Sequence, residues 1–338
     1  MQITILIDFK AFPESRFWIK VELEKMGYDI QLLGIQNYNT NDEQSKSGKL
    51  KLWIKYLKLA VSGIKKTKKN DIIISWNFVV GAMLGFICKI FNIKRKIISL
   101  NMIAHQKGFI NSLFRKLVYN SAFKYSNFWF SVNDAQLIDN YSKSFHFPTE
   151  RIFVLHDVFY ESDEQSDYQE AGDYIFTGGD AFRDWINFIK CAEEFPGIKF
   201  VAVARKKYFP NTGKIPENLE MYFDISPEQF YSLLKGSRIV FLPLNSLAPC
   251  GLIVMIKAAL LSKPVIITAT PSTKNYITDL VSGKLVPMHN LSEMKKAITM
   301  LYESKEMQIE YTEHLKSHLL ANFSTKANAE IIDKIIKI

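Results

Sequence analysis

A glycine pair with an arginine a few residues later is the arrangement in this sequence best suited to holding a diphosphate. Gly178 and Gly179 end an apolar segment, and Arg183 stands just before a helical pattern. Glycines let a ligand come close to the backbone, a helix amino terminus offers unpaired N–H groups, and a guanidinium supplies a fork of donors. An ordinary strand-to-helix turn with a solvated arginine would account for the same residues equally well.

Two more segments of the second half could bring polar groups to the same place. Arg205 follows one apolar run, and Ser246, Cys250 and Gly251 lie in a loop between another apolar run and a helical pattern. Because ligands of parallel sheets bind at the carboxyl ends of the strands, we expect these residues near Arg183. The alternative for Arg205 is a basic loop on the surface.

The first half offers fewer candidates. Asp8 and Lys10 come at the end of its first apolar segment, and His105 follows its fourth. These positions place all three at the edge of a parallel sheet where ligands bind. A lone histidine is more often structural than catalytic, so both interpretations of His105 stay open.

The elements that must position these residues form two α/β layouts. Twelve short apolar segments alternate with helical patterns, and their continuous hydrophobicity is typical of parallel strands buried on both faces. The sequence therefore predicts two Rossmann-like α/β domains that face each other across a cleft. The expected strands are Ile3–Asp8, Tyr28–Leu33, Asp71–Trp76, Arg95–Leu100, Phe128–Val132, Ile152–Leu155, Tyr174–Thr177, Lys199–Ala204, Leu219–Phe223, Ile239–Pro243, Val265–Thr268 and Lys284–Val286.

The polar, acidic segment Tyr160–Gly172 is the best candidate for a link between the two domains. We expect a first Rossmann-like domain at 1–160, a linker at 161–172 and a second at 173–322. The tail from 291 onward is mostly helical, and its last helix, 323–338, is expected to pack back on the first domain.

Charge is distributed unevenly along the 338 residues, whose formal net charge is +9. Residues 1–160 carry 23 Lys and Arg against 12 Asp and Glu, whereas residues 161–338 carry 20 against 22. A uniformly basic nucleic-acid binder would not show this pattern, and no recognition module is visible, so we expect no nucleic acid. An anionic neighbour is expected for the first half alone.

A lysine-rich helical segment, Lys49–Lys69, is the most distinctive feature of the first half. One face carries Lys51, Lys55, Lys58 and Lys65, and another carries Trp53, Leu57, Ala60, Val61 and Ile64. A helix packed on the core with a solvated basic face explains the pattern. A helix lying on an anionic bilayer, where each lysine adds about 1 kcal/mol, explains it as well.

The remaining composition points to a reducing compartment. The three cysteines are odd in number and far apart, and the first residues lack the basic stretch and cleavage site of a secretory signal. The longest apolar run, Phe78–Ile87, is too short to span a bilayer. We expect a cytoplasmic protein, peripheral on the inner face of the membrane if the lysine-rich helix binds lipid.

The second half resembles the donor domain of GT-B glycosyltransferases, especially the retaining family 4 type of bacterial polysaccharide and glycan synthesis. The stretch Gly251–Ile266 matches its motif G-L-x-x-x-E-A-M-A-x-G-x-P-V-I, with Ala258, Ser262 and Pro264 in register. The segments around Phe223–Ile225 and Thr273–Pro287 are similar to its nucleotide-base segment and to its turn of the type D-G-x-N-G-x-L-V-P. The resemblance covers roughly 174–290, and the first half only in layout.

This resemblance implies transfer of a hexose-type sugar from a nucleotide-diphosphate sugar to a glycan or lipid-linked acceptor. It implies a catalytic role for Arg183 and, near the reacting sugar, for His105. Donor contacts would come from Gly178, Gly179, Arg183, Arg205, Phe223, Asp224, Ser246, Cys250, Gly251 and Lys257. No cofactor is expected besides the co-substrate, and no metal, since the sequence has no Asp-x-Asp.

Lys257 departs from the family pattern, which has there a glutamate that binds the ribose hydroxyls. No glutamate occurs between Glu228 and Glu293, and an ammonium cannot accept hydroxyl protons. Ribose recognition must therefore differ. The departure keeps two alternatives open, a non-catalytic GT-B subunit that binds a glycan or a partner transferase, and a nucleotide-sugar epimerase. The sequence does not indicate an oligomeric state.

Overall fold

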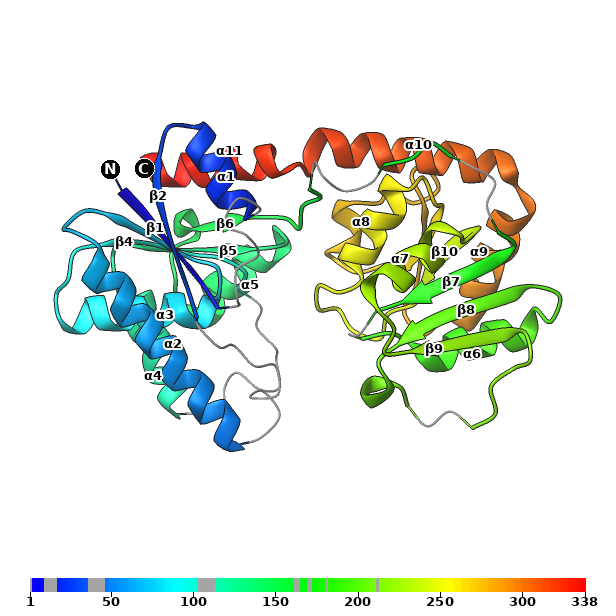
Figure 1. The fold of residues 1–338 in the computed structure, drawn as a ribbon, viewed down its shortest axis with the longest axis horizontal. Coiled ribbons are helices and arrows are strands. Elements are labelled where there is room, and N and C mark those ends of the chain that lie inside the picture. Colours follow the sequence, from blue (N-terminus) through cyan, green and yellow to red (C-terminus); the bar gives the residue numbers. More distant parts are fainter. Residues whose placement is uncertain are drawn as a thin grey trace. The chain divides into compact units, whose positions relative to one another are not determined.

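The chain folds into two compact α/β units (Figure 1). The computed structural model describes residues 2–8, 17–35, 46–102, 113–160, 165–168, 172–179, 182–210 and 213–338. Unit 1 comprises Met1–His156 and Thr325–Ile338, and unit 2 comprises Asp157–Ser324. The chain therefore passes between the units twice.

The sheet of unit 1 is entirely parallel and has the strand order β2-β1-β3-β4-β5-β6. Isoleucine-rich segments such as β3 are buried along their whole length, as expected for strands covered on both faces. The strands are β1 (Gln2–Ile7), β2 (Asp29–Gly34), β3 (Ile72–Ser75), β4 (Lys96–Ser99), β5 (Phe128–Val132) and β6 (Ile152–Val154). The strand order reverses between β1 and β3, which is where such sheets bind ligands.

Helices cover both faces of this sheet. One face packs on α2 (Lys46–Lys66), α3 (Phe78–Ile90), α4 (Leu113–Phe123) and α5 (Gln136–Phe145). The other is covered by α1 (Trp18–Lys25) and by α11 (Thr325–Lys337) from the far end of the chain (Figure 1). The Tyr28 hydroxyl donates to Asp333 at 2.6 Å and holds α11 against this face.

The sheet of unit 2 is also parallel, with the order β12-β11-β10-β7-β8-β9. The chain runs outward from β7 through β8 to β9 and then returns to β10 beside β7, so the reversal lies between β7 and β10. The strands are β7 (Tyr174–Gly178), β8 (Lys199–Ala204), β9 (Leu219–Phe223), β10 (Ile239–Leu242), β11 (Val265–Thr268) and β12 (Lys284–Val286).

Two helical layers enclose the sheet of unit 2. One face packs on α6 (Trp185–Glu194) and α9 (Leu291–Glu303), and the other on α7 (Pro227–Lys235), α8 (Leu252–Leu260) and α10 (Lys305–Asn322). Helix α7 begins with a capping box, in which the Ser226 hydroxyl accepts from the N–H of Gln229 and the Gln229 side chain accepts from that of Ser226. Single 3₁₀ turns occur at Thr149–Arg151, Lys206–Tyr208 and Thr273–Asn275.

The structure confirms the predicted α/β class with two Rossmann-like sheets. Each of the twelve strands lies within one residue of its predicted bounds. The predicted capping box in the sequence Ser-Pro-Glu-Gln, which begins at Ser226, is confirmed. The predicted helical tail is also confirmed, as α9, α10 and α11. None of the described helices is long and apolar enough to cross a bilayer.

The segment expected as a linker is in part an integral portion of unit 2. The chain leaves unit 1 after His156, before the polar segment begins, and the described residues 165–168 lie against α8 and α10. The N–H of Ser166 donates to the Leu260 carbonyl at 3.0 Å, and the Ser262 hydroxyl donates to the Ser166 carbonyl at 2.6 Å. Backbone hydrogen bonds, which polar composition does not predict, fix this segment.

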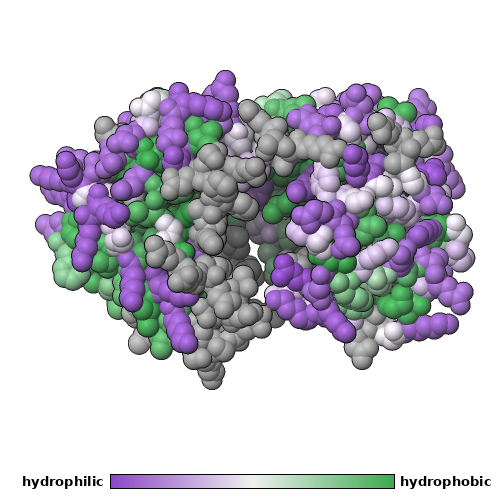
Figure 2. All heavy atoms as spheres, in the orientation of Figure 1, coloured by the Kyte–Doolittle hydropathy of each residue, from purple (hydrophilic) through white to green (hydrophobic). Residues whose placement is uncertain are grey.

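The lysine-rich helix α2 packs on the core with most of the predicted apolar face, since Ala60 is buried and Trp53, Val61 and Ile64 pack against the core. Its buried side chains, Tyr56, Leu59 and Ala60, face the core of unit 1. Leu57, which was expected on that face, is 46% exposed. Figure 2 shows hydrophilic and hydrophobic residues interleaved on the surface over this helix. Since Leu59 and Tyr56 turn inward, Leu57 lies among the lysines.

Candidate active site

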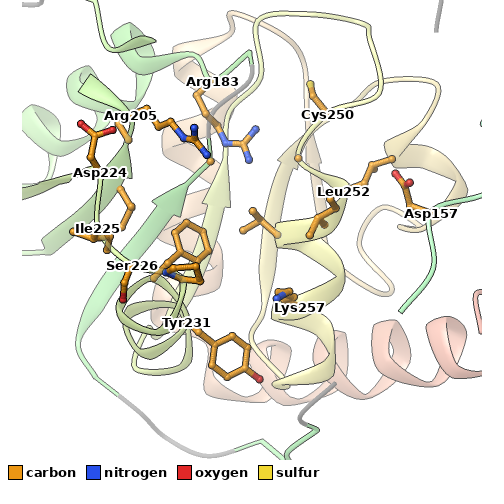
Figure 3. A pocket seen from close by; sticks show the side chains of 18 of the residues that line it. Asp157, Arg183, Arg205, Asp224, Ile225, Ser226, Tyr231, Cys250, Leu252 and Lys257 are labelled. Carbon is orange, nitrogen blue, oxygen red and sulfur yellow. The ribbon is translucent and has the colours of Figure 1, made fainter. Parts of the chain in front are cut away.

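A cavity of about 520 Å³ opens at the strand-order reversal of unit 2. Its lining comes from the ends of β7 and β8, the start of α7 and the loop before α8 (Figure 3). Of the predicted donor residues it brings together Gly179, Arg183, Arg205, Asp224, Cys250, Gly251 and Lys257. This volume is that of a typical small-molecule pocket.

Arg183 is the central cation of this cavity and is only 5% exposed. Its backbone pairs with Leu244 as an isolated antiparallel bridge, and its carbonyl accepts from the Asn245 side chain at 3.2 Å. Its Nε donates to the Gly178 carbonyl at 2.9 Å. These bonds fix the guanidinium at the pocket wall, so that its Nη groups reach the loops on both sides.

Two glycines make room for this guanidinium. A Cβ on Gly179 would stand 2.6 Å from Nη2 of Arg183, and one on Gly251 would stand 3.4 Å from Nη1. Both glycines have positive φ, +121° and +77° respectively, so side chains there would also strain the backbone. Gly251 is the N-cap of α8, and the amino end of this helix therefore borders the cavity close to Arg183.

Arg205 supplies a second cation at the same end of the cavity. It follows β8 and is exposed, and Figure 3 shows its guanidinium turned toward that of Arg183. Next to it, Asp224 ends β9 with a left-handed φ of 52°, and its N–H donates to the Ala204 carbonyl. This bond ties the end of β9 to β8 and directs the chain toward the start of α7.

Lys257 lies at the other end of the cavity, on α8, and faces Tyr231 of α7 (Figure 3). Its ammonium is 5.5 Å from the centroid of the tyrosine ring. A lysine and a phenol therefore occupy the end of the pocket where the family pattern has a carboxylate. An ammonium donates hydrogen bonds only, whereas a phenol can donate or accept, so this pair can still hold sugar hydroxyls.

Three predicted donor residues do not line the cavity. Gly178 accepts the hydrogen bond from Arg183, and a Cβ there would stand 2.6 Å from the Phe230 ring. Phe223 packs edge-on against Phe209 with ring centroids 5.3 Å apart. The Ser246 hydroxyl accepts from the N–H of Ala248 at 3.1 Å. Gly178 and Ser246 thus shape the loops around the site.

Cys250 is a buried member of the lining. Burial raises the pKa of its thiol, although the nearby charge of Arg183 acts in the opposite direction. The thiol is therefore protonated at neutral pH and contributes shape, since only the thiolate is strongly nucleophilic.

The corresponding edge of unit 1 carries a carboxylate. One oxygen of Asp8, at the end of β1, accepts from the Asn77 amide at 2.6 Å and from the Tyr56 hydroxyl at 3.3 Å. Asp8 was predicted at this edge. Lys10 and His105 lie outside the described residues.

Sequence reasoning missed several residues that line the donor cavity. Tyr231, Phe230 and Ile253 are among them. Asp157, the first residue of unit 2, also lines the cavity and was a weaker candidate because it follows a strand end. Ser226 and Pro227 were recognised as a helix start but not as part of a site. The proximity of α7 to the strand-order reversal was the only signal that could have found them.

Comparisons with known proteins agree with this geometry. Residues 205–318 match the family described as glycosyl transferases group 1. No match is found among curated protein sequences. Among solved structures, Anabaena Alr3699/HepE in complex with UDP is 13% identical, with a TM-score of 0.71 and full coverage of both chains.

Two other solved structures are similar over nearly the whole length. Sucrose-phosphate synthase from Thermosynechococcus elongatus is 12% identical and has a TM-score of 0.74, with 100% of this chain and 98% of that chain covered. WaaG, a glycosyltransferase involved in lipopolysaccharide biosynthesis, is 10% identical and has a TM-score of 0.66, with 98% and 99% covered. At these identities the likeness establishes the fold.

The two parallel six-stranded units thus form a GT-B fold, the architecture of a large class of glycosyltransferases. The matched family lies in the unit that carries the cavity. The chain thus has a GT-B fold, and part of unit 2, residues 205–318, matches the group 1 glycosyl transferases.

Proposed function

We propose that the cavity of unit 2 holds the nucleotide diphosphate of a UDP-sugar, and that the enzyme transfers the sugar to a glycan or lipid-linked acceptor in the synthesis of a surface polysaccharide or glycoconjugate. The observation that carries this proposal is the buried guanidinium of Arg183 between Gly179 and Gly251. The structurally similar HepE was solved with UDP and with UDP-glucose, which favours uridine as the base.

In this proposal the diphosphate lies between Arg183, Arg205 and the amino end of α8. Departure of the nucleotide concentrates negative charge on the diphosphate, and cations fixed in advance stabilise that charge without reorganising. Lys257 and Tyr231 hold the ribose, and the start of α7 lies at the base. The role of His105 beside the reacting sugar rests on the family resemblance.

The donor proposal is tested by UDP binding and by transfer from radiolabelled UDP-sugars. Arg183→Ala removes charge-assisted hydrogen bonds of about 1.5–3 kcal/mol, so UDP affinity is expected to fall about 10- to 100-fold. Arg238→Ala is a matched control, because this guanidinium stacks 3.9 Å from the Tyr302 ring in the same unit and does not line the cavity. Equal losses in the two variants would contradict the proposal.

We also propose that α2 rests on an anionic membrane surface and brings the enzyme to a lipid-linked sugar. Leu50, Ile54 and Leu57, one helical turn apart, are 65%, 46% and 46% exposed. Lys51, Lys55, Lys58 and Lys65 lie along the same helix, whereas Trp53 is partly buried against the core. Exposed leucines beside lysines fit the boundary between acyl chains and anionic headgroups.

Flotation with vesicles that contain phosphatidylglycerol tests the membrane proposal. Neutralising Lys51, Lys55 and Lys58 to glutamine should weaken binding about 100-fold, since each contributes about 1 kcal/mol. The control neutralises three exposed lysines of unit 2, Lys190, Lys274 and Lys296. Unchanged binding of the α2 variant would refute the proposal.

A further inference from the structure

A second cavity of about 590 Å³ adjoins the donor cavity of unit 2. It opens beside the start of α6 and the turn Lys206–Tyr208, whereas the donor cavity lies beside α7 and α8. Arg183 and Arg205 line both cavities. A ligand in the second cavity would therefore contact the same two cations as the diphosphate of the donor.

The wall of this cavity exposes large apolar side chains. Phe182 is 41% exposed, Ile186 56% and Tyr208 55%, and Pro210 completes the wall. Exposed apolar groups gathered around a cavity mark a binding site more often than scattered ones do. The cavity therefore offers an apolar platform next to the guanidinium groups.

The platform is held in a strained but fixed conformation. Phe182 has a left-handed φ of 54°, which is unfavourable for a bulky side chain. The Phe182 carbonyl accepts from the N–H of Asn245 at 3.0 Å, and the bridge between Arg183 and Leu244 follows directly. Such local strain is typical of functional sites, and here it presents the Phe182 ring at the surface.

The charge around the platform is positive. Arg205 lines the cavity, and Lys207 lies 4.5 Å from the centroid of the Tyr208 ring. The acidic residue of the lining, Asp184, is buried and bonded to the Asn187 N–H and amide and to His289, at 2.8 Å from its Nδ1. Because that carboxylate is engaged, the open side of the cavity favours an anion.

We propose that this second cavity is an acceptor subsite that takes a sugar ring bearing an anionic group, either a carboxylate or a phosphate. The apolar face of the ring lies on Phe182 and Tyr208, and the anionic group meets Arg205. The position is suitable because the acceptor hydroxyl must come within about 3–3.5 Å of the reacting carbon, which is attached to the diphosphate. This assignment rests on the proposed donor site and adds the chemical class of the acceptor.

Equilibrium binding of small probes to the full chain saturated with UDP tests the subsite. The probes are glucose 6-phosphate, a glucuronic-acid-containing disaccharide, the neutral disaccharide cellobiose and inorganic phosphate. At least one anionic sugar should bind at least tenfold more tightly than both cellobiose and phosphate. The arm that binds tells whether the anion is a phosphate or a carboxylate. Equal binding of cellobiose, or of phosphate alone, would overturn the proposal.

Two variants test whether the probe binds in the second cavity. Tyr208→Ala and Ile186→Asp should each weaken binding of the anionic sugar at least fivefold, while the UDP affinity stays within twofold. Leu320→Ala removes an exposed side chain of α10 and is the matched control, expected to change neither affinity. Unchanged sugar binding in both cavity variants would refute the subsite.

Competition distinguishes this proposal from two alternatives. If UDP-glucose displaces the probe and UDP does not, the cavity holds the donor sugar and the acceptor assignment is wrong. If UDP itself fails to bind the unmodified protein, the donor proposal fails. In that case the probe titration without UDP still tests the subsite alone.

Discussion

The two units have the same sheet architecture but opposite chemistry at the point where the strand order reverses. In unit 2 this edge carries Gly179, Arg183 and the amino end of α8. In unit 1 it carries Asp8, bonded to Asn77 and Tyr56. The fold provides an edge for ligands in both cases. Among the residues that the structure describes, the edge of unit 2 carries the cations to which we assign the diphosphate, and that of unit 1 carries a carboxylate.

Backbone conformation separates the two edges as well. Gly179 and Gly251 use positive φ to approach Arg183, whereas positive φ near the edge of unit 1 occurs at an asparagine, Asn101. The Asn101 amide donates to the Trp76 carbonyl at 3.2 Å, so this side chain links the chain after β4 to the chain after β3. Within the described residues, glycines with positive φ stand beside an arginine at the edge of unit 2.

Among the substitutions that test this comparison of the two edges, Gly179→Ala is expected to have the largest effect on UDP affinity. The added methyl group would meet Arg183 at 2.6 Å and displace its guanidinium, so UDP affinity should fall about 10- to 30-fold, measured by calorimetry. Gly213→Ala is the control, since Gly213 also has a positive φ, +76°, but no neighbour within 4 Å. A comparable loss of UDP affinity in the control would show that strain, and not Arg183, is responsible.

Lys257→Ala should have a smaller effect on the same ligand. Loss of one hydrogen-bonding ammonium near the ribose is expected to weaken UDP binding about 3- to 10-fold. Uracil alone, which lacks the ribose, should bind both forms equally. If the substitution leaves UDP affinity unchanged, Lys257 does not replace the glutamate of the family pattern.

Asp8→Ala should affect the stability of unit 1 without affecting UDP binding by unit 2. Because Asp8 accepts hydrogen bonds from Asn77 and Tyr56, its loss should lower the free energy of unfolding by about 1–3 kcal/mol in chemical denaturation. The UDP affinity should stay within twofold. A fall in affinity that matches Arg183→Ala would mean that both edges bind the nucleotide.

The smallest effect on ligand binding is expected from Lys263, a buried cation of unit 2 before β11. Burial, with the charge of Lys235, lowers the pKa of Lys263 to about 8 from 10.5. The folded state thus binds this proton less tightly than the unfolded state does, so its destabilising contribution is complete below pH 8 and is relieved as the pH rises toward 10.5. Lys263→Met should raise stability at pH 7 and flatten this rise without changing UDP affinity. The measurement is the free energy of unfolding between pH 7 and 10.5. If it rises equally with pH in the unmodified protein and in Lys263→Met, Lys263 is not the cause of the rise.

The strands were predictable because they are buried on both faces, and continuous runs such as Ile72–Ile74 leave a clear signal. That Gly179 and Arg183 lie together at one cavity was predictable, because both follow the same strand end in the sequence; their binding of phosphate stays a prediction. The contact between Lys257 and Tyr231 was not, because it depends on how α7 and α8 pack. The hydrogen bonds that hold Ser166 on unit 2 were not predictable either, because composition does not show which backbone groups pair.

Unit 1 cannot complete its fold until α11 has been synthesised, because this helix belongs to unit 1 but follows unit 2 in the chain. Helix α11 covers α1, yet the ribosome makes it only after the whole of unit 2. Until then Trp18 and Ile19 of α1 belong to a layer that is still incomplete, whereas unit 2 has its entire chain available earlier. Since domains tend to fold as they emerge, unit 2 can become native first, and unit 1 must wait for α11.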